Sequence, residues 1–306
     1  MTPPGTFQPA ERTILSPCKI NLFLDVIGRR PDGYHEVVTV IEPLALCDRL
    51  VFRTTREKIE VAADDPEVPD GEENIVCRAA RLLRESAGTY GGVSIRIEKN
   101  VPSAAGLGGG SADAAAALRT LNDLWDLGLS LPDLTALAGK LGSDVPFFLQ
   151  PRTSLWRGRG EKGEPLPEAP PFFAVVINPA FPLSTRRAYS ELAVSGPARL
   201  PHPNLAGVTD ALKRSDLAAL GKALYNRFQE TLAPRYPRIQ ELLDFFRERE
   251  ALGALLSGSG PTVIGLAAEK ERAEQLAADA RAAFPETYRI VVAANLPSPP
   301  PTGDKF

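Results

Sequence analysis

Histidine and cysteine are scarce in this chain, which has only two histidines and three cysteines among 306 residues. Two histidines cannot supply a histidine-rich metal site. The cysteines, Cys18, Cys47 and Cys77, form neither an even framework nor a metal-ligand spacing. Scattered thiols of this kind are typical of a reducing compartment, so the expected location is the cytoplasm.

Long apolar runs and an excess of positive charge are also missing. No stretch is long enough to cross a bilayer, and the N-terminus lacks the layout of a signal peptide. The formal net charge is −3, so neither a membrane nor nucleic acid is an expected partner. Hydrophobic residues still make up 43% of the chain, enough for a full core, and the length suggests two domains or one large one.

Apolar periodicity divides the first half of the chain into strands and helices. Alternating apolar residues predict four strands, over 18–27, 37–43, 49–54 and 92–101. Helices are predicted from the N-cap Asn74 to Ala87, from about Ser111 onward, and over 130–141 with Ser130 as N-cap. Residues 1–11 are expected to form a loose extension.

The second half of the chain continues in mixed elements. The pattern predicts a strand over 172–178, helices over 207–225, 237–250 and 269–284, a hairpin over 254–267 and a strand over 287–296. The Pro-rich end, 297–306, cannot join a sheet. Strands and helices do not alternate regularly, so the fold class is α+β. The Gly- and Pro-rich segment 158–171 predicts a boundary between domains 1–160 and 161–306.

A glycine-rich loop over 106–110 runs directly into the helix near Ser111. Glycines let a ligand approach the main chain, and a helix N-terminus presents unpaired N–H groups and a positive dipole end. Together they suit the phosphates of a nucleotide. The loop alone also fits a plain flexible connection. Its glycine spacing excludes a P-loop and a Rossmann fingerprint, and the protein-kinase motifs are absent.

A second glycine cluster, Gly258-Ser259-Gly260, lies between two apolar strands. It can be a tight hairpin turn, or a loop that closes over the nucleotide phosphates or the acceptor. Local sequence leaves both interpretations open.

Several blocks of the chain resemble one superfamily of small-molecule kinases. SPCKINLFLDV, with Pro17, Lys19 and Asn21, VPSAAGLGGGSADAAAAL and LLSGSGPTVIGL resemble three motifs of galactokinase, homoserine kinase, mevalonate kinase and phosphomevalonate kinase. RRPDGYHEV, LGSDVPFFL and GRGE are similar to blocks of the 4-diphosphocytidyl-2-C-methyl-D-erythritol kinases. The blocks occur in the same order from about residue 12 to 296.

This resemblance implies ATP- and Mg²⁺-dependent phosphorylation of the 2-hydroxyl of 4-diphosphocytidyl-2-C-methyl-D-erythritol, a step of non-mevalonate isoprenoid synthesis. It also implies an N-terminal domain like that of a ribosomal protein, a ferredoxin-like C-terminal domain and an active site in the cleft between them. The expected assembly is a monomer or a weak homodimer. The alternative is a homoserine- or mevalonate-type kinase, and the PDGYH block with Tyr189 argues against it.

The resemblance assigns two catalytic residues. Asp144 matches the aspartate that serves as base, and its apolar neighbours favour a raised carboxyl pKa. Lys19 matches the lysine that orients the aspartate and stabilises charge on the phosphoryl group. From local sequence alone, Asp144 would be a helix N-cap and Lys19 an outward-facing strand lysine.

The remaining site residues follow from the same match. ATP is expected to contact Gly106, Leu107, Gly108, Gly109, Gly110, Ser111, Lys99 and Asn74. Ser111 is placed to bond a phosphate or Mg²⁺, and no protein metal cluster is expected. Asp113 is expected at the loop–helix junction. Lys99 also fits an ordinary strand lysine, and Asn74 an ordinary helix cap.

The acceptor is expected to contact Asn21, Tyr34, His35, Tyr189, Gly258, Ser259 and Gly260. Cytosine would stack between Tyr34 and Tyr189, and His35 would read its polar edge. Tyr34 can instead pack as a turn aromatic, and Tyr189 on the apolar stripe of a short helix. Cys18, where alanine is usual, and the bulky Arg152 and Trp156 depart from the family pattern.

Overall fold

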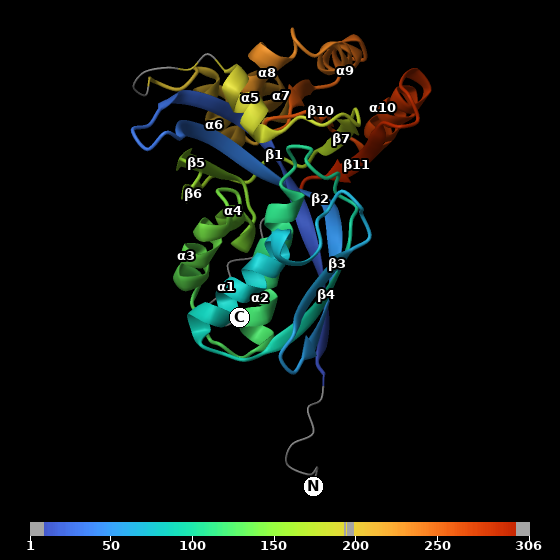
Figure 1. The fold of residues 1–306 in the computed structure, drawn as a ribbon. Coiled ribbons are helices and arrows are strands. Elements are labelled where there is room, and N and C mark those ends of the chain that lie inside the picture. The colour runs from blue at the N-terminus through green and yellow to red at the C-terminus, as the bar shows by residue number, and fades with distance from the viewer. Residues whose placement is uncertain (1–8, 193, 195–198, 298–306) are drawn as a thin grey trace. The chain divides into compact units, whose positions relative to one another are not determined.

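The structure, a computed structural model, describes residues 9–192, 194 and 199–297 (Figure 1). They form two compact units that draw on interleaved stretches of chain. The first unit comprises residues up to 18, 47–103 and 108–150, and the second comprises 19–46, 104–107 and the chain from 151 onward. A division at residue 160 stays a prediction. The loose extension and the Pro-rich end lie outside the described residues, except for residues 9–11 and 297.

Two long strands contribute residues to both units. They are β1 (Glu11–Arg29) and β2 (His35–Thr55). In the first unit β2 pairs antiparallel with β4 (Gly92–Glu98), and β4 pairs parallel with β3 (Ile59–Ala63). The sequence predicted two strands, over 37–43 and 49–54, where β2 is one. Asp48 lies between the two predicted strands, and its carboxylate is buried and hydrogen-bonded, so the strand continues through it.

Helices cover the sheet of the first unit on one side (Figure 1). They are α1 (Ile75–Ala87), α2 (Gly109–Leu124), α3 (Leu131–Leu141) and α4 (Val145–Leu149), with a 3₁₀ turn, η1 (Gly71–Glu73), ahead of α1. Asn74 caps α1 and Ser130 caps α3, both as predicted. Gly88 ends α1 in the left-handed region, and Ser130 forms a capping box with Asp133. Buried alanines of α2 let α1 pack closely against it.

In the second unit β2 pairs antiparallel with β5 (Ser154–Gly158), and β5 pairs with β6 (Lys162–Pro165). The predicted boundary segment therefore contains a strand. β1 pairs parallel with the short β8 (Tyr225–Asn226).

A second sheet of four antiparallel strands lies in the same unit, in the order β11-β7-β10-β9. The strands are β7 (Phe173–Asn178), β9 (Gly253–Leu256), β10 (Val263–Ala267) and β11 (Arg289–Ala294). Two helices pack on this sheet, α9 (Pro237–Glu248) and α10 (Lys270–Ala283). Phe246 of α9 fits over Gly265 of β10, where a Cβ would overlap its ring, so the helix lies close to the sheet.

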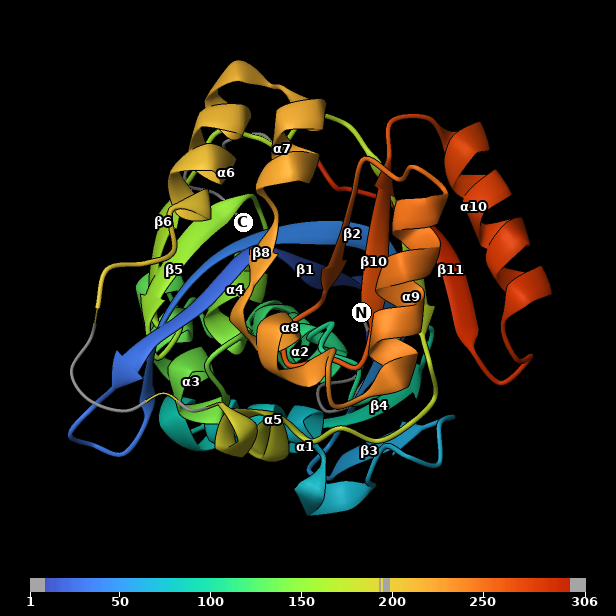
Figure 2. The same ribbon diagram turned by 90° about the horizontal axis from the view of Figure 1, so that it is seen from above.

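Four shorter helices complete the second unit: α5 (Thr185–Glu191), α6 (Asn204–Arg214), α7 (Leu217–Ala223) and α8 (Arg227–Leu232). The single helix predicted over 207–225 is wrong. Ser215 adopts a left-handed φ of 52° and ends α6, and the Asp216 carboxylate then caps α7. The chain reverses there, so α6 and α7 pack side by side (Figure 2). No helix within residues 9–192, 194 and 199–297 is long and apolar enough to span a membrane.

Candidate active site

Lys19 is held in the interior of the second unit. Its side chain leaves β1 on the face opposite to Ile20, and the residue is only 4% exposed. The ammonium donates to Oδ1 of Asn21 at 2.9 Å and to the carbonyl oxygen of Gly106 at 2.7 Å. The interpretation of Lys19 as an outward-facing strand lysine is therefore wrong.

Asn21 orients this ammonium through a short chain of hydrogen bonds. While Oδ1 accepts from Lys19, the Asn21 amide nitrogen donates to Oγ1 of Thr39 at 2.8 Å. Thr39 donates in turn to the carbonyl oxygen of Phe23 at 2.7 Å. Both ends of the amide are engaged, so Asn21 fixes the lysine. Its contact with the acceptor stays a prediction.

The β9–β10 loop packs directly against Gly106. Oγ of Ser257 donates to the Gly106 carbonyl oxygen at 3.2 Å. A Cβ on Gly258 would lie 2.8 Å from that oxygen and 3.3 Å from Nζ of Lys19, so only a bare backbone fits. The hairpin interpretation is confirmed, and the turn lies beside Lys19. The hydroxyl of Ser259 shares a hydrogen bond of 3.1 Å with the hydroxyl of Thr185.

Three sequence motifs thus meet in the second unit: the lysine strand, the start of the glycine loop and the second glycine cluster. The Lys19 backbone N–H also donates to the Leu107 carbonyl oxygen at 2.9 Å, which ties the loop to β1. The glycine loop passes into the first unit between Leu107 and Gly108.

The aromatic residues expected at the acceptor lie elsewhere in the second unit. Tyr34 is 53% exposed, and the Arg159 guanidinium lies 3.8 Å from its ring centroid. The rings of His35 and Tyr189 stack at 4.8 Å, and Tyr189 also meets Phe228 edge-on at 4.9 Å. Burial, and then the charge of Arg29, lower the pKa of His35. The structure brings His35 and Tyr189 together, while a base between Tyr34 and Tyr189 stays a prediction.

Arg159 is a contact that sequence reasoning missed. It belongs to the GRGE block, which carried the resemblance and was given no role. A cation over an aromatic face is attracted by the ring quadrupole. This contact covers one face of Tyr34.

In the first unit, α2 begins at Gly109, two residues before the predicted start. Gly108 is its N-cap with φ of 73°, and a glycine has no side chain to satisfy the first N–H groups. These groups are therefore available to an anion. Ser111 lies half-buried in the same turn, with its hydroxyl on the first turn of the helix.

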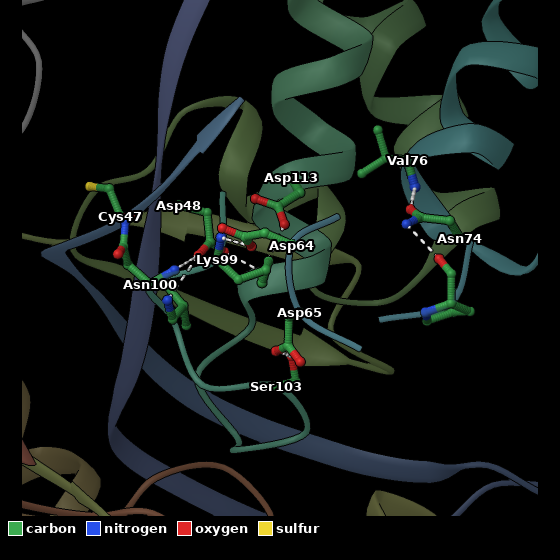
Figure 3. A network of polar contacts seen from close by, with 12 residues as sticks. Cys47, Asp48, Asp64, Asp65, Asn74, Val76, Lys99, Asn100, Ser103 and Asp113 are labelled. Atoms are coloured by element: carbon green, nitrogen blue, oxygen red, sulfur yellow. Dashed lines mark hydrogen bonds and ion pairs between the residues drawn. The ribbon is translucent and has the colours of Figure 1, made fainter. Parts of the chain in front are cut away.

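Lys99 occupies a buried ionic cluster at the end of β4 (Figure 3). Its ammonium donates to Asp48 and to Oδ2 of Asp113, the latter at 2.9 Å, and its side chain is only 4% exposed. Burial alone would lower the pKa of Lys99, but the charges of Asp113 and Asp48 outweigh it and raise the pKa. Burial raises the pKa of the Asp113 carboxyl. Asp113 lies within α2, beyond the predicted loop–helix junction.

Asn74 uses its side chain as a helix cap. Oδ1 accepts from the Val76 N–H at 2.8 Å and the amide nitrogen donates to the Pro69 carbonyl oxygen at 2.9 Å (Figure 3). The cap interpretation is confirmed. Contacts of Asn74 and Lys99 with a nucleotide stay predictions.

Asp144 stands immediately before α4, and its side chain does not cap that helix. Within the described part of the chain the carboxylate also has no hydrogen bond or ion pair, although the residue is half-buried. Four buried apolar residues follow it, Val145 to Phe148. Asp144 thus occupies the N-cap position of α4 without a side-chain cap bond, and its role as the base stays a prediction.

Comparison with known proteins places the chain among kinases. The family described as "GHMP kinases N terminal domain" matches residues 74–151, and "GHMP kinases C terminal" matches residues 208–286. A 4-diphosphocytidyl-2-C-methyl-D-erythritol kinase of Symbiobacterium thermophilum is 46% identical over 261 residues, covering 84% of this chain and 91% of that protein. The chain belongs to the 4-diphosphocytidyl-2-C-methyl-D-erythritol kinases.

Solved structures agree with this membership. A crystal structure of 4-(cytidine 5'-diphospho)-2C-methyl-D-erythritol kinase has a TM-score of 0.77 and 36% identity, covering 93% of this chain and 99% of that one. A homoserine kinase from Cytophaga hutchinsonii has a TM-score of 0.75 at 19% identity, covering 94% and 95% of the two chains, and shares the fold. In this member of the kinase family, the N-terminal match contains the glycine loop from Gly106 to Gly110 and Asp144. The C-terminal match contains Gly258 to Gly260.

Proposed function

We propose that this chain transfers the γ-phosphoryl group of ATP to the 2-hydroxyl of 4-diphosphocytidyl-2-C-methyl-D-erythritol. It acts in the non-mevalonate route to isoprenoid precursors. Membership of the kinase family supports the reaction. The observation that carries it is the hydrogen bond from Lys19 to the Gly106 carbonyl oxygen, because it joins the lysine motif to the phosphate-binding motif.

Phosphoryl transfer needs a base, charge stabilisation and correct positioning. In this proposal Asp144 takes the proton of the acceptor hydroxyl, whose oxygen forms a bond to the γ-phosphorus while the bond to ADP breaks. An aspartate without competing hydrogen bonds suits this role. The buried Lys19 ammonium supplies fixed positive charge for the transferred group.

The nucleotide phosphates would rest on the glycine loop and the first N–H groups of α2. Gly108 leaves these donors without a side-chain cap, which supports anion binding there. The proposed ATP contacts are Gly106, Leu107, Gly108, Gly109, Gly110 and Ser111, with Lys99 and Asn74 as outer contacts. Asp48 and Asp113 fix the position of Lys99, and the start of α1 fixes that of Asn74, so both would meet the nucleotide from fixed positions.

Mg²⁺ fits this donor set as an ion bound mainly by ATP. Among residues 9–192, 194 and 199–297 no group of three His, Cys, Asp or Glu side chains is arranged to hold a metal. Mg²⁺ in kinases is bound by one or two protein groups together with substrate phosphates. The Ser111 hydroxyl would hold it, and the ion would neutralise charge on the β- and γ-phosphates.

The acceptor would be read by Tyr34, His35 and Tyr189, with Asn21 and the loop Gly258 to Gly260 near its hydroxyl. Aromatic faces stack on a base. The ring pair of His35 and Tyr189 supplies a rigid aromatic surface in the second unit, which supports this placement.

Finer features of the fold are proposed with the function. The C-terminal domain is ferredoxin-like, supported by the strand order β11-β7-β10-β9 and by α9 and α10 in its crossovers. The remaining domain is like that of a ribosomal protein, with the active site in the cleft between the domains. The enzyme works in the cytoplasm as a monomer or weak homodimer, without nucleic acid.

The test is an assay of ADP release with purified protein, ATP and Mg²⁺. Turnover is expected with 4-diphosphocytidyl-2-C-methyl-D-erythritol and none with homoserine or mevalonate. The product should carry phosphate on the 2-oxygen, as phosphorus NMR would show. Turnover of homoserine or mevalonate in place of the cytidine compound would overturn the assignment.

A further inference from the structure

Asp48 stabilises residues 99–101, which follow β4. Its Oδ1 accepts from the backbone N–H groups of Asn100 and Val101 at 2.7 and 2.8 Å, and its Oδ2 accepts from Lys99 (Figure 3). The carboxylate is fully buried. Charge-assisted bonds to the main chain are among the stronger hydrogen bonds in proteins. They fix the turn at 99–101.

This turn lies against the start of α2. A Cβ on Gly109 would lie 3.0 Å from Val101 Cγ1 and 3.3 Å from Oδ2 of Asp48. The main chain at Gly109 therefore rests on the turn without a side chain between them. The hydrogen bonds of Asp48 that fix the 99–101 turn therefore also support the first turn of α2.

Asp113 links α2 to the 99–101 turn. It lies four residues after Gly109, and its Oδ2 accepts from Lys99 at 2.9 Å. The buried Ser16 is a further hydrogen-bond partner of this carboxylate. The bond to Lys99 is charge-assisted, and it joins α2 to the 99–101 turn.

We propose that Asp113 is a positioning residue of the ATP site, which holds the first turn of α2 to the 99–101 turn through Lys99. This rests on the proposed function, because it takes the N–H groups of that turn as donors to ATP. Asp113 does not touch the nucleotide. It sets where the donors lie, so its loss weakens ATP binding and leaves acceptor binding unchanged.

The experiment compares Asp113→Asn with Asp123→Asn in the full chain. Asp123 lies at the other end of α2 and forms an exposed ion pair with Arg12, so it controls for the substitution itself. Isothermal calorimetry measures binding of a non-hydrolysable ATP analogue with Mg²⁺. Removing a buried charge-assisted bond is expected to weaken binding about tenfold for Asp113→Asn and less than about twofold for Asp123→Asn.

Steady-state kinetics supply a second readout. For Asp113→Asn we expect the KM for ATP to rise about tenfold, with kcat and the KM for the acceptor within about threefold of wild type. Analogue binding within about twofold of wild type, in folded protein, would overturn the proposal. Equal increases in the KM for ATP and the KM for the acceptor would also overturn it, because a general destabilisation of the fold raises both.

If Asp113→Asn fails to fold, Asp113→Glu takes its place. It keeps the charge beside Lys99 and moves the carboxylate by one methylene, so analogue binding is expected to weaken by at least about threefold. Wild-type affinity in Asp113→Glu would contradict a positioning role. The calorimetric measurement contains no acceptor, so it does not depend on the proposed reaction. If wild-type protein binds the analogue but does not phosphorylate the cytidine substrate, the proposed reaction is rejected and the positioning role of Asp113 is still tested.

Discussion

The Lys19 ammonium and the Gly106 carbonyl oxygen are joined by a hydrogen bond of 2.7 Å, although the residues lie 87 positions apart. The same oxygen accepts from Ser257. Hydrogen bonds to this one main-chain carbonyl therefore connect β1, the glycine loop and the β9–β10 turn. Its position depends on Gly106 keeping a φ of 76°, which residues with a side chain rarely adopt.

Gly106→Ala should destabilise the second unit and reduce activity. A Cβ there would overlap the Ser257 carbonyl oxygen, which is main chain and cannot move freely. Strain at such a position costs about 1–3 kcal/mol of unfolding free energy. Denaturant unfolding followed by circular dichroism measures the loss.

Gly139→Ala is the matched control for this substitution. Gly139 lies within α3 with nothing near its added Cβ, so alanine is expected to raise the unfolding free energy by about 0.5–1 kcal/mol. Equal effects at the two positions would mean that the contact with Ser257 does not matter.

Asp144→Asn should stop phosphoryl transfer and leave nucleotide binding nearly intact. The amide cannot accept the proton of the acceptor hydroxyl, and loss of a general base lowers kcat by about 10²–10⁴-fold. The side chain makes no cap bond to α4, so stability should be unchanged. The measurements are kcat and calorimetric binding of an ATP analogue.

Asp70→Asn controls for the change of charge, since Asp70 is exposed and its side chain caps nothing. Its kcat should equal that of wild type. Full turnover in Asp144→Asn would remove this aspartate as the base.

Tyr189→Leu should weaken acceptor binding alone. The substitution removes the ring that stacks on His35 at 4.8 Å while keeping an apolar side chain against Phe228. Stacking on a base is worth about 1–3 kcal/mol, so the KM for the cytidine substrate should rise about 5- to 100-fold. The KM for ATP should stay within about twofold. Tyr90→Leu, at an 87% exposed position, serves as control, and a parallel rise in both KM values would count against the role.

Local signals predicted the helix caps and the glycine turns but not the continuity of β2. Asn74, Gly88 and Ser130 act within one turn of chain, where sequence neighbours decide the outcome. Glu42 is different, because its partners Thr153 and Asn295 lie 111 and 253 positions away. The burial and pairing of its carboxylate therefore could not be predicted from its sequence neighbours.

The candidate site shows the same division. Motifs pointed to Lys19 and Asp144, yet only the coordinates show that Lys19 is buried and that the Asp144 side chain makes no cap bond. Asp48 gave no local signal at all, because its role depends on main-chain groups about 50 positions later. Arg159 carried a signal in the GRGE block without any indication of its contact with Tyr34.

Glu42 makes the stability of this enzyme depend on pH. The carboxyl is fully buried in β2, and it accepts from Thr153 at 2.6 Å and from the Asn295 amide at 3.1 Å. Burial raises its pKa from 4.5 to about 7, despite these two hydrogen bonds. Neither partner is a cation, so the native state favours the neutral carboxylic acid.

The direction of the effect follows from proton binding. Between pH 4.5 and about 7 the native state holds the proton that the unfolded chain has released, so this group's stabilisation is complete below pH 4.5. It falls as the pH rises and levels off above about 7. Over that window we expect a loss on the order of 3 kcal/mol from this group.

Glu42→Gln removes the titration and keeps the shape of the side chain. Relative to wild type, its unfolding free energy should therefore increase from pH 5 to about pH 7 and then level off, which urea unfolding at fixed ionic strength would measure. Glu60→Gln, on the exposed side of β3, should follow the wild-type curve throughout. Parallel curves for wild type and Glu42→Gln would show that Glu42 stays ionised in its buried position, held by Thr153 and Asn295 alone.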